Sequence, residues 1–185
     1  MSATTTLQKA DNHAIAYVPL GEKQEIKLTV GMVRQHLTSP TRQGKIANDS
    51  QIIHFMMLCR SRELNPWAGD AYLVGYDTKD GPQFSLITAH QALLKRAEAC
   101  PTFDGMESGV IVEGANGVDM REGDFVGRNE KLLGGWASCY RKDRGKKFYD
   151  ALNVETYATG QSRWNKDPAG MIVKCAEASV LRKAF

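Results

Sequence analysis

Ala71-Tyr72-Leu73-Val74-Gly75-Tyr76 is rich in strand-forming residues, and Phe84-Ser85-Leu86-Ile87 is a second run of the same kind. The segment between them, Asp77-Thr78-Lys79-Asp80-Gly81-Pro82, has the residues that favour turns. This spacing predicts a β-hairpin, which is an antiparallel pair of strands. No helix interrupts the pair, as it would in a strand–helix–strand unit of a parallel sheet.

Helical patterns lie on both sides of the hairpin. Upstream, Asn48-Asp49-Ser50 supplies N-cap candidates for an amphipathic helix that ends near Leu64, before Asn65-Pro66. Downstream, Thr88 is expected to cap a helix that runs through Ala99. A shorter helical pattern precedes all of these, from residue 29 to residue 37.

The second half of the chain alternates strands and turns before a final helix. Residues 109–113 predict a strand that enters a turn at 114–117, and residues 134–141 and 147–152 predict two more strands. Asp167-Pro168 predicts the start of a helix that runs to the last residue. The predicted class is therefore α+β, with an antiparallel sheet and hairpins packed with helices.

The first residues show no sustained period, so we expect residues 1–25 to form a mobile or loosely attached arm. We assign residues 1–45 to this arm and the short helix, and residues 46–185 to one core.

The composition is that of a globular protein. The 185 residues are 42% hydrophobic and 24% charged, which excludes a disordered or collagen-like chain. The longest apolar stretch, residues 14–20, is too short to span a membrane, and no secretory leader is recognisable. The four cysteines are widely spaced within apolar segments, as expected in a reducing compartment. We therefore expect a soluble, cytoplasmic protein without membrane contact.

The charge is unevenly distributed. The formal net charge is only +3, but residues 140–185 carry 10 basic and 5 acidic side chains, a local excess of +5. Such an excess suits a polyanionic partner, although a mixed-charge solvated surface would have the same composition.

The motifs of common enzyme classes are missing. The chain has no phosphate-binding loop, no Cys-x-x-Cys or His-Glu-x-x-His zinc motif and no Gly-x-Ser-x-Gly elbow. Asp119, Glu122 and Asp124 gather in a glycine-rich segment that does not fit the calcium pattern, so they are either solvated or a weak cation site. We predict no catalytic residue and no metal ligand. No motif requires a cofactor, whether ATP or magnesium, although a magnesium ion would be compatible with the sequence.

The densest chemical feature is Tyr140-Arg141-Lys142-Asp143-Arg144-Gly145-Lys146-Lys147-Phe148-Tyr149, with five cations and three aromatic rings on a predicted hairpin. Arginine forks suit phosphate oxygens, and nearby rings can stack on bases. Lysines also blunt the exposed edges of sheets, which is the alternative. The candidate DNA-binding residues here are Arg141, Lys142, Arg144, Lys146 and Lys147.

A second basic set lies around the final helix and comprises Arg163, Lys166, Lys174, Arg182 and Lys183. Lys174 and Arg182 are about 80° apart around the helix axis, so they could flank one groove. Lys174 could instead pair with Glu177 at i,i+3. Leu181 and Phe185 leave an apolar strip that is either core or a subunit contact.

Five segments together resemble the RecT/Bet family of phage-type recombinases, the single-strand annealing proteins. The resemblance spans roughly residues 50–185. It rests on the order of Leu64-Asn65-Pro66-Trp67, Phe103-Asp104-Gly105-Met106, Tyr140-Arg141-Lys142-Asp143-Arg144, Trp164-Asn165-Lys166-Asp167-Pro168, and the closing helix with Lys174-Cys175-Ala176 and Arg182-Lys183-Ala184-Phe185.

The resemblance implies an α+β core that assembles into rings or helical filaments. It also implies binding of single-stranded DNA and of the nascent annealed duplex in a basic groove, without ATP. Carried over to this chain, the groove residues are Arg141, Lys142, Arg144, Lys166, Lys174 and Arg182. Lys95, Lys146 and Lys147 are added from local charge alone. Trp67 is expected to be a buried structural plug rather than a base-stacking residue.

Family members continue into a C-terminal segment that contacts a partner exonuclease or the host single-strand binding protein. This chain stops at Phe185, in mid-helix by pattern, so we expect either a truncated chain or a missing partner-binding part. We therefore do not predict those contacts.

Three functions follow from these observations. The first is ATP-independent binding of single-stranded DNA and annealing of complementary strands in homologous recombination. The second is a nucleic-acid module that coats strands without annealing them, for which the same basic residues would serve. The third, a metal-dependent nuclease acting through Asp119, Glu122 and Asp124, has poor ligand spacing.

Overall fold

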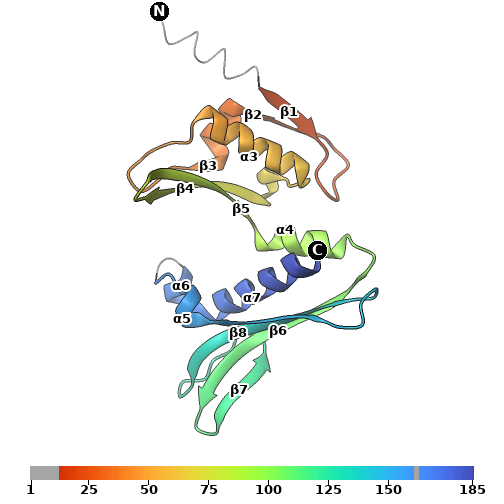
Figure 1. The fold of residues 1–185 in the computed structure, drawn as a ribbon, viewed down its shortest axis with the longest axis vertical. Helices are drawn as coiled ribbons and strands as arrows, with labels where there is room; N and C mark the ends of the chain where they lie inside the picture. Colours follow the sequence, from red (N-terminus) through yellow and green to blue (C-terminus); the bar gives the residue numbers. More distant parts are fainter. Residues whose placement is uncertain (1–12, 161–162) are drawn as a thin grey trace, which may run out of the picture. The chain divides into compact units, whose positions relative to one another are not determined.

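The computed structural model describes residues 13–160 and 163–185. The chain divides into two compact units, Met1–Lys95 (unit 1) and Arg96–Phe185 (unit 2), and each is considered by itself. Both units combine helices with strands (Figure 1). The named strands pair antiparallel, except for one short parallel pair in unit 1. The predicted α+β class is confirmed.

Unit 1 opens with a small hairpin of β1 (Ala14–Tyr17) and β2 (Ile26–Thr29). The Tyr17 side chain is buried, and its hydroxyl donates to the Leu64 carbonyl at 2.6 Å. The loosely attached arm expected over residues 1–25 is therefore wrong from Ala14 onward, while residues 1–12 lie outside the described residues. The cause is a contact between residues 47 positions apart, which no local sequence period reveals.

Two helical segments follow in unit 1. The Thr29 side chain caps α2 (Val30–Met32), which continues as one wider π-helical turn, η1 (Val33–Leu37). The helix α3 (Asp49–Ser61) begins at Asn48, whose side chain accepts from the Gln51 amide while the Gln51 side chain accepts from the Asn48 amide, both at 2.9 Å. This reciprocal capping box confirms the N-cap predicted from the sequence.

The main sheet of unit 1 has the order β3-β4-β5. The edge strand β3 (Thr38–Ser39) runs parallel to β4 (Ala71–Thr78), and β4 pairs with β5 (Gly81–Thr88) to form the predicted hairpin. The turn is tighter than the sequence suggested, because Asp77 still pairs with Pro82.

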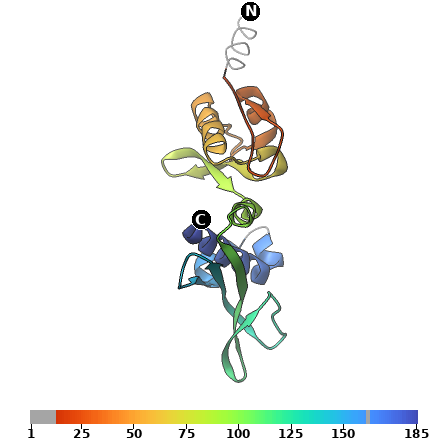
Figure 2. The ribbon, with the colours of Figure 1, turned by 90° about the vertical axis from the view of Figure 1, so that its right-hand side faces the viewer.

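One face of the β4–β5 hairpin packs against α3 (Figures 1 and 2). Leu73 and Leu86 on this face join the core that also contains Phe55. The register places Tyr72, Tyr76 and Ile87 on the other face, where each is at least 40% exposed. Along the chain, η2 (Pro66–Ala68) comes directly before β4, and α4 (His90–Glu98) follows β5.

Unit 2 is built on a four-stranded antiparallel sheet of order β7-β6-β8-β9. Its strands are β6 (Phe103–Gly114), β7 (Gly117–Glu122), β8 (Lys131–Arg141) and β9 (Phe148–Asn153). The strand β6 begins six residues before the predicted start at Gly109. Pairing of Phe103 with Arg141 extends it through Asp104 and Gly105, which are poor strand formers.

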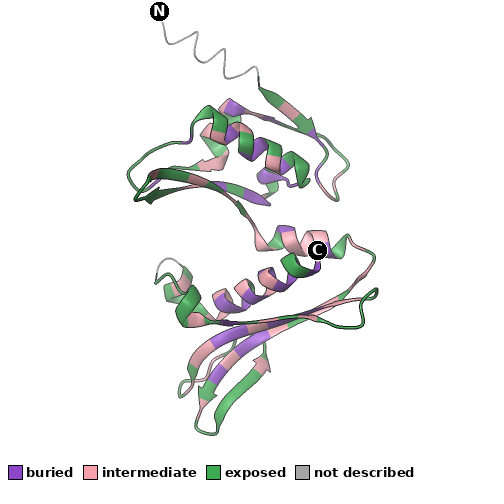
Figure 3. Cartoon of the chain, in the orientation of Figure 1, coloured by how far each residue is buried: buried purple, intermediate pink, exposed green. Residues whose placement is uncertain are grey.

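The helix α7 (Pro168–Ala184) lies along one face of this sheet, and its buried positions face the strands (Figures 1 and 3). It starts as predicted, with the Asp167 carboxylate accepting from the Gly170 amide at 2.9 Å and Pro168 in the first turn. The short helices α5 (Val154–Tyr157) and α6 (Arg163–Lys166) precede it.

The close approach of α7 to β8 depends on Gly135. A Cβ atom there would lie 2.9 Å from the carbonyl carbon and oxygen of Ile172. At the end of α7, Leu181 is buried, and the Phe185 ring packs edge-on against Phe103, with 5.8 Å between ring centroids. The apolar strip of Leu181 and Phe185 is therefore part of the core of unit 2.

Among the described residues, no helix combines the length and the apolar character needed to cross a membrane.

Candidate nucleic-acid interface

The connection between β8 and β9 carries four exposed cations, which we call the basic turn: Lys142, Arg144, Lys146 and Lys147. Its backbone is tied down, because the Lys142 amide donates to the Thr102 carbonyl at 2.8 Å and the Arg144 amide to the Arg141 carbonyl at 3.1 Å. None of the four forms a salt bridge with another described residue. The basic turn therefore offers its charges to solvent or to an anion.

Arg141 differs from these four, because its donors are occupied. Its guanidinium binds both oxygens of the Asp143 carboxylate, and it also donates to the Ala184 carbonyl at the end of α7. The same group lies over the Phe185 ring, 5.2 Å from the centroid. Asp143 raises the pKa of Arg141, and the Arg141 hydrogen bond lowers the pKa of Asp143. The predicted DNA ligand Arg141 thus joins the hairpin to the C-terminal end of α7.

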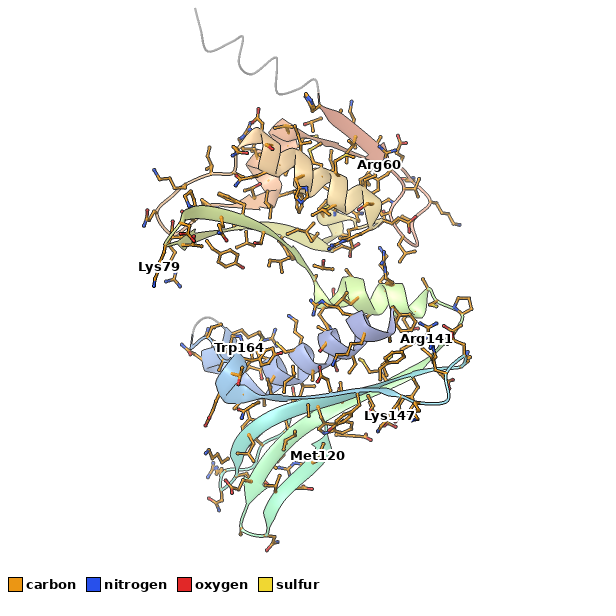
Figure 4. All side chains as sticks on the ribbon, viewed as in Figure 1. Arg60, Lys79, Met120, Arg141, Lys147 and Trp164 are labelled. Carbon is orange, nitrogen blue, oxygen red and sulfur yellow. The ribbon has the colours of Figure 1, made fainter. Side chains whose placement is uncertain are left out.

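The sheet face opposite α7, which we call the open face, holds two of the three aromatic side chains of the hairpin, Tyr140 and Tyr149. Lys147 Nζ lies 5.9 Å from the Tyr140 ring centroid and 5.5 Å from that of Tyr149. The Tyr140 hydroxyl donates to Glu107 at 2.7 Å, which raises the pKa of Tyr140. Figure 4 shows Lys147 and Arg141 on opposite faces of the sheet. Around Lys147 the open face therefore places one cation beside two rings and one carboxylate.

The basic residues of α6 and α7 divide in two groups, and Arg163, which donates to Asp167 at 3.1 Å, belongs to the paired one. Lys166, Lys174 and Arg182 are exposed. On α7, Lys174 and Arg182 lie away from the buried positions Ile172 and Ala176. Lys183 instead donates to Asp150 of β9 at 2.7 Å, and Ser179 donates to the same carboxylate. These two bonds hold α7 against β9 and lower the pKa of Asp150.

Lys95 belongs to unit 1, whereas the other candidates belong to unit 2. Its ammonium group lies 3.5 Å from the Asp70 carboxylate and 3.6 Å from that of Glu22, so two carboxylates compensate its charge.

The structure brings four of the predicted cations together in the basic turn. Within unit 2, α7 covers one face of the sheet and Lys147 lies on the other. Lys174 and Arg182 are exposed on α7, which covers the face of the sheet opposite to the one that carries Lys147.

The acidic residues considered for metal binding, Asp119, Glu122 and Asp124, are all exposed. Within residues 13–160 and 163–185, no group of three or more His, Cys, Asp or Glu side chains is arranged to hold a metal ion.

Trp67 was expected to be a buried plug, and this is wrong, because its side chain is 41% exposed. The buried residues of its turn are Asn65 and Pro66, so the anchoring falls on the two residues before it. Asn and Pro before the tryptophan favour a tight turn, but only the fold decides whether the ring that follows is buried. Trp67 therefore departs from the high average burial of tryptophan.

A comparison of the sequence with known protein families finds a match. The model of the RecT family matches residues 23–185, which covers all of unit 2 and residues 23–95 of unit 1. No curated protein matches the chain.

Proposed function

The chain belongs to the RecT family, and we propose that it binds single-stranded DNA through unit 2 and anneals complementary strands in homologous recombination. Membership of this family carries a general role in single-strand annealing during recombination. Independence from ATP, the DNA-contacting residues and assembly into homo-oligomers are the further parts of the proposal.

The observation that carries the proposal is the electrostatics of the basic turn. Over residues 142–147, four exposed cations are accompanied by a single acidic residue, Asp143. The carboxylate of Asp143 is bound first of all by Arg141, which offsets its charge, so the four neighbouring cations remain a net positive cluster. Such a cluster on a constrained turn suits the closely spaced phosphates of a nucleic-acid strand.

Lys166, Lys174 and Arg182 supply a second group of exposed cations on α6 and α7. Salt screens each contact between a cation and a phosphate, so a single copy of the protein would bind a strand weakly. In a homo-oligomer, many copies bind one strand, and their contacts act together.

The mechanism needs no change of covalent bonds. Cations that contact phosphates leave the bases next to those contacts free to meet a second strand, and correct base pairing decides which encounter persists. We propose that this cycle requires neither ATP nor another cofactor and takes place in the cytoplasm.

An annealing assay tests the proposal. Two complementary fluorescent oligonucleotides are added one after the other, with and without protein and without ATP. We expect the protein to accelerate pairing and the acceleration to fade with added salt. Arg144→Ala should weaken the effect, whereas Arg128→Ala, which removes an exposed arginine outside the basic turn, should not. Strands that bind but pair no faster would identify a coating module instead.

A further inference from the structure

We propose that a cavity beside Trp67 in unit 1 binds a nucleobase of single-stranded DNA; this inference rests on the proposed function. The cavity has a volume of about 460 Å³, and its lining includes His36, Thr38, Ser39, Trp67 and Tyr72. This size lies within the usual range of about 300–1,000 Å³ for small-molecule sites. All the lining residues belong to unit 1.

Hydrogen bonds hold the backbone of the turn that carries Trp67, and the Trp67 side chain is exposed. The Asn65 side chain accepts from the Trp67 amide at 3.0 Å and from the Ala68 amide at 3.2 Å. The Asn65 amide donates to Asp70 at 2.9 Å, and the Asn65 side chain donates to Glu22 at 2.7 Å. Four hydrogen bonds on one buried residue thus fix a turn that presents a large ring to solvent. A ring on a fixed backbone loses less conformational entropy on binding than a ring on a flexible loop.

The rings around the cavity are arranged to receive another ring. Trp67 is 41% exposed, and Tyr72 is 47% exposed. The planes of His36 and Trp67 are tilted by 53°, with 6.2 Å between centroids, so the imidazole does not stack on the indole. Gly69 lets the Tyr72 hydroxyl approach the turn closely, since a Cβ atom there would lie 2.9 Å from that oxygen. The indole face is therefore accessible for stacking.

The edge of the cavity supplies polar groups without charge. Thr38 and Ser39 form the edge strand β3, and edge strands have backbone groups that no neighbouring strand pairs. The described residues that line the cavity include no Asp, Glu, Lys or Arg. A nucleobase matches this chemistry, because it has a flat apolar face and an uncharged hydrogen-bonding edge. Without Lys or Arg the cavity does not attract an anion, and without Asp or Glu it does not attract a cation, so its lining favours an uncharged, flat group such as a base.

Binding to two oligonucleotides of equal length tests this inference. One is an oligothymidylate, and the other is an abasic strand with the same phosphates. We expect wild-type protein to prefer the oligothymidylate. Trp67→Ala should lower the affinity for oligothymidylate by about fivefold to a hundredfold and leave the affinity for the abasic strand unchanged. Trp67→Phe, which keeps a ring, should retain most of the preference.

Phe125→Ala is the matched control, because Phe125 is an exposed ring of unit 2 and lies outside the cavity. It should change neither affinity. Equal losses for both strands in Trp67→Ala would overturn the inference, and so would unchanged affinities combined with a smaller oligomer, which would identify a contact between copies. Wild-type protein that binds both strands equally would overturn only the inference. Wild-type protein that binds neither would overturn the proposed function as well.

Discussion

Arg141 binds the Asp143 carboxylate at two points, with Nε 2.8 Å from Oδ1 and Nη2 2.7 Å from Oδ2. The negative charge of Asp143 lies inside the most basic segment of the chain and is offset by the positive charge of Arg141. It also leaves Arg141 in contact with the carbonyl of Ala184 and the ring of Phe185, so that one side chain connects the β8–β9 hairpin with the end of α7.

Arg141→Lys should lower the melting temperature of the protein by several degrees. Lysine keeps the charge but lacks the planar fork that binds Asp143 and the Ala184 carbonyl together. Thermal unfolding followed by circular dichroism measures the effect. Arg144→Ala is the control and should melt like the wild type, because Arg144 is exposed. Equal melting temperatures for the two variants would contradict the structural role of Arg141.

Arg144→Ala and Lys174→Ala should each weaken binding to single-stranded DNA and flatten its salt dependence. A phosphate contact contributes about −0.7 to the slope of log K against log salt concentration on single strands. Each variant should therefore lose about that amount from the slope, measured by fluorescence anisotropy at several salt concentrations. Native circular dichroism with unchanged slopes in both variants would refute their assignment as phosphate ligands.

Gly135→Ala should destabilise unit 2 by about 1–3 kcal/mol, because the new methyl group would meet the α7 backbone at 2.9 Å. Backbone atoms cannot move aside as a flexible side chain does. Urea unfolding measures the change. Gly145→Ala is the matched control, since a Cβ atom at Gly145 has no neighbour within 4 Å among the described residues. A similar stability for both variants would show that α7 does not pack closely on Gly135.

Asp150→Asn should lower the free energy of unfolding at pH 7 by about 1 kcal/mol. Hydrogen bonds from Lys183 and Ser179 lower the pKa of Asp150 in the folded protein. A lowered carboxyl pKa stabilises the folded state above the ordinary value of about 4, and this stabilisation is lost as the pH falls through the folded value. The difference between variant and wild type should therefore shrink below about pH 4.

Urea unfolding at neutral and acid pH tests this prediction for Asp150. Asp124→Asn removes an exposed carboxylate and should have little effect at either pH. A gap between Asp150→Asn and wild type that stays constant down to acid pH would argue against an ionised Asp150 as the stabilising group.

Cys100 should react with an alkylating reagent before the other three cysteines. Its sulfur lies 3.2 Å from the Thr102 hydroxyl, and hydrogen bonds from Thr102 lower the pKa of the thiol. Burial raises the pKa of Cys59 to about 12 and also raises the pKa values of Cys139 and Cys175. Because the thiolate is the reactive form, Cys100→Ser should abolish the fast phase of labelling. A fast phase that persists in this variant would refute the assignment.

Much of the local structure could be predicted from the sequence. The N-cap at Asn48 and the helix start at Asp167-Pro168 depend on hydrogen bonds within four residues, so the residue types are sufficient. The β4–β5 hairpin is equally local. Its turn proved tighter than predicted because strand pairing extends through Asp77 and Pro82, residues that normally favour turns.

The placement of the basic residues could be predicted only in part. The cluster at 141–147 was visible as a run of charge, but the run does not reveal that Arg141 binds Asp143 and the Ala184 carbonyl. Nor does it reveal that Lys95 is compensated by Asp70 and Glu22, which are 25 and 73 positions away. Such pairings are decided by which side chains the fold brings within reach.

The chain's own residues were thus enough to indicate the α+β class, the family resemblance and a basic hairpin, because caps, turns and charge runs act over a few neighbouring residues. Only the tertiary structure decided which of the described cations remain unpaired, and that Arg141 and Lys147 lie on opposite faces of the sheet. It also decided that Trp67 is exposed on a turn held by Asn65. Burial and ion pairing depend on segments far apart in the chain, and their free energies are set by packing and solvent access that no local pattern contains.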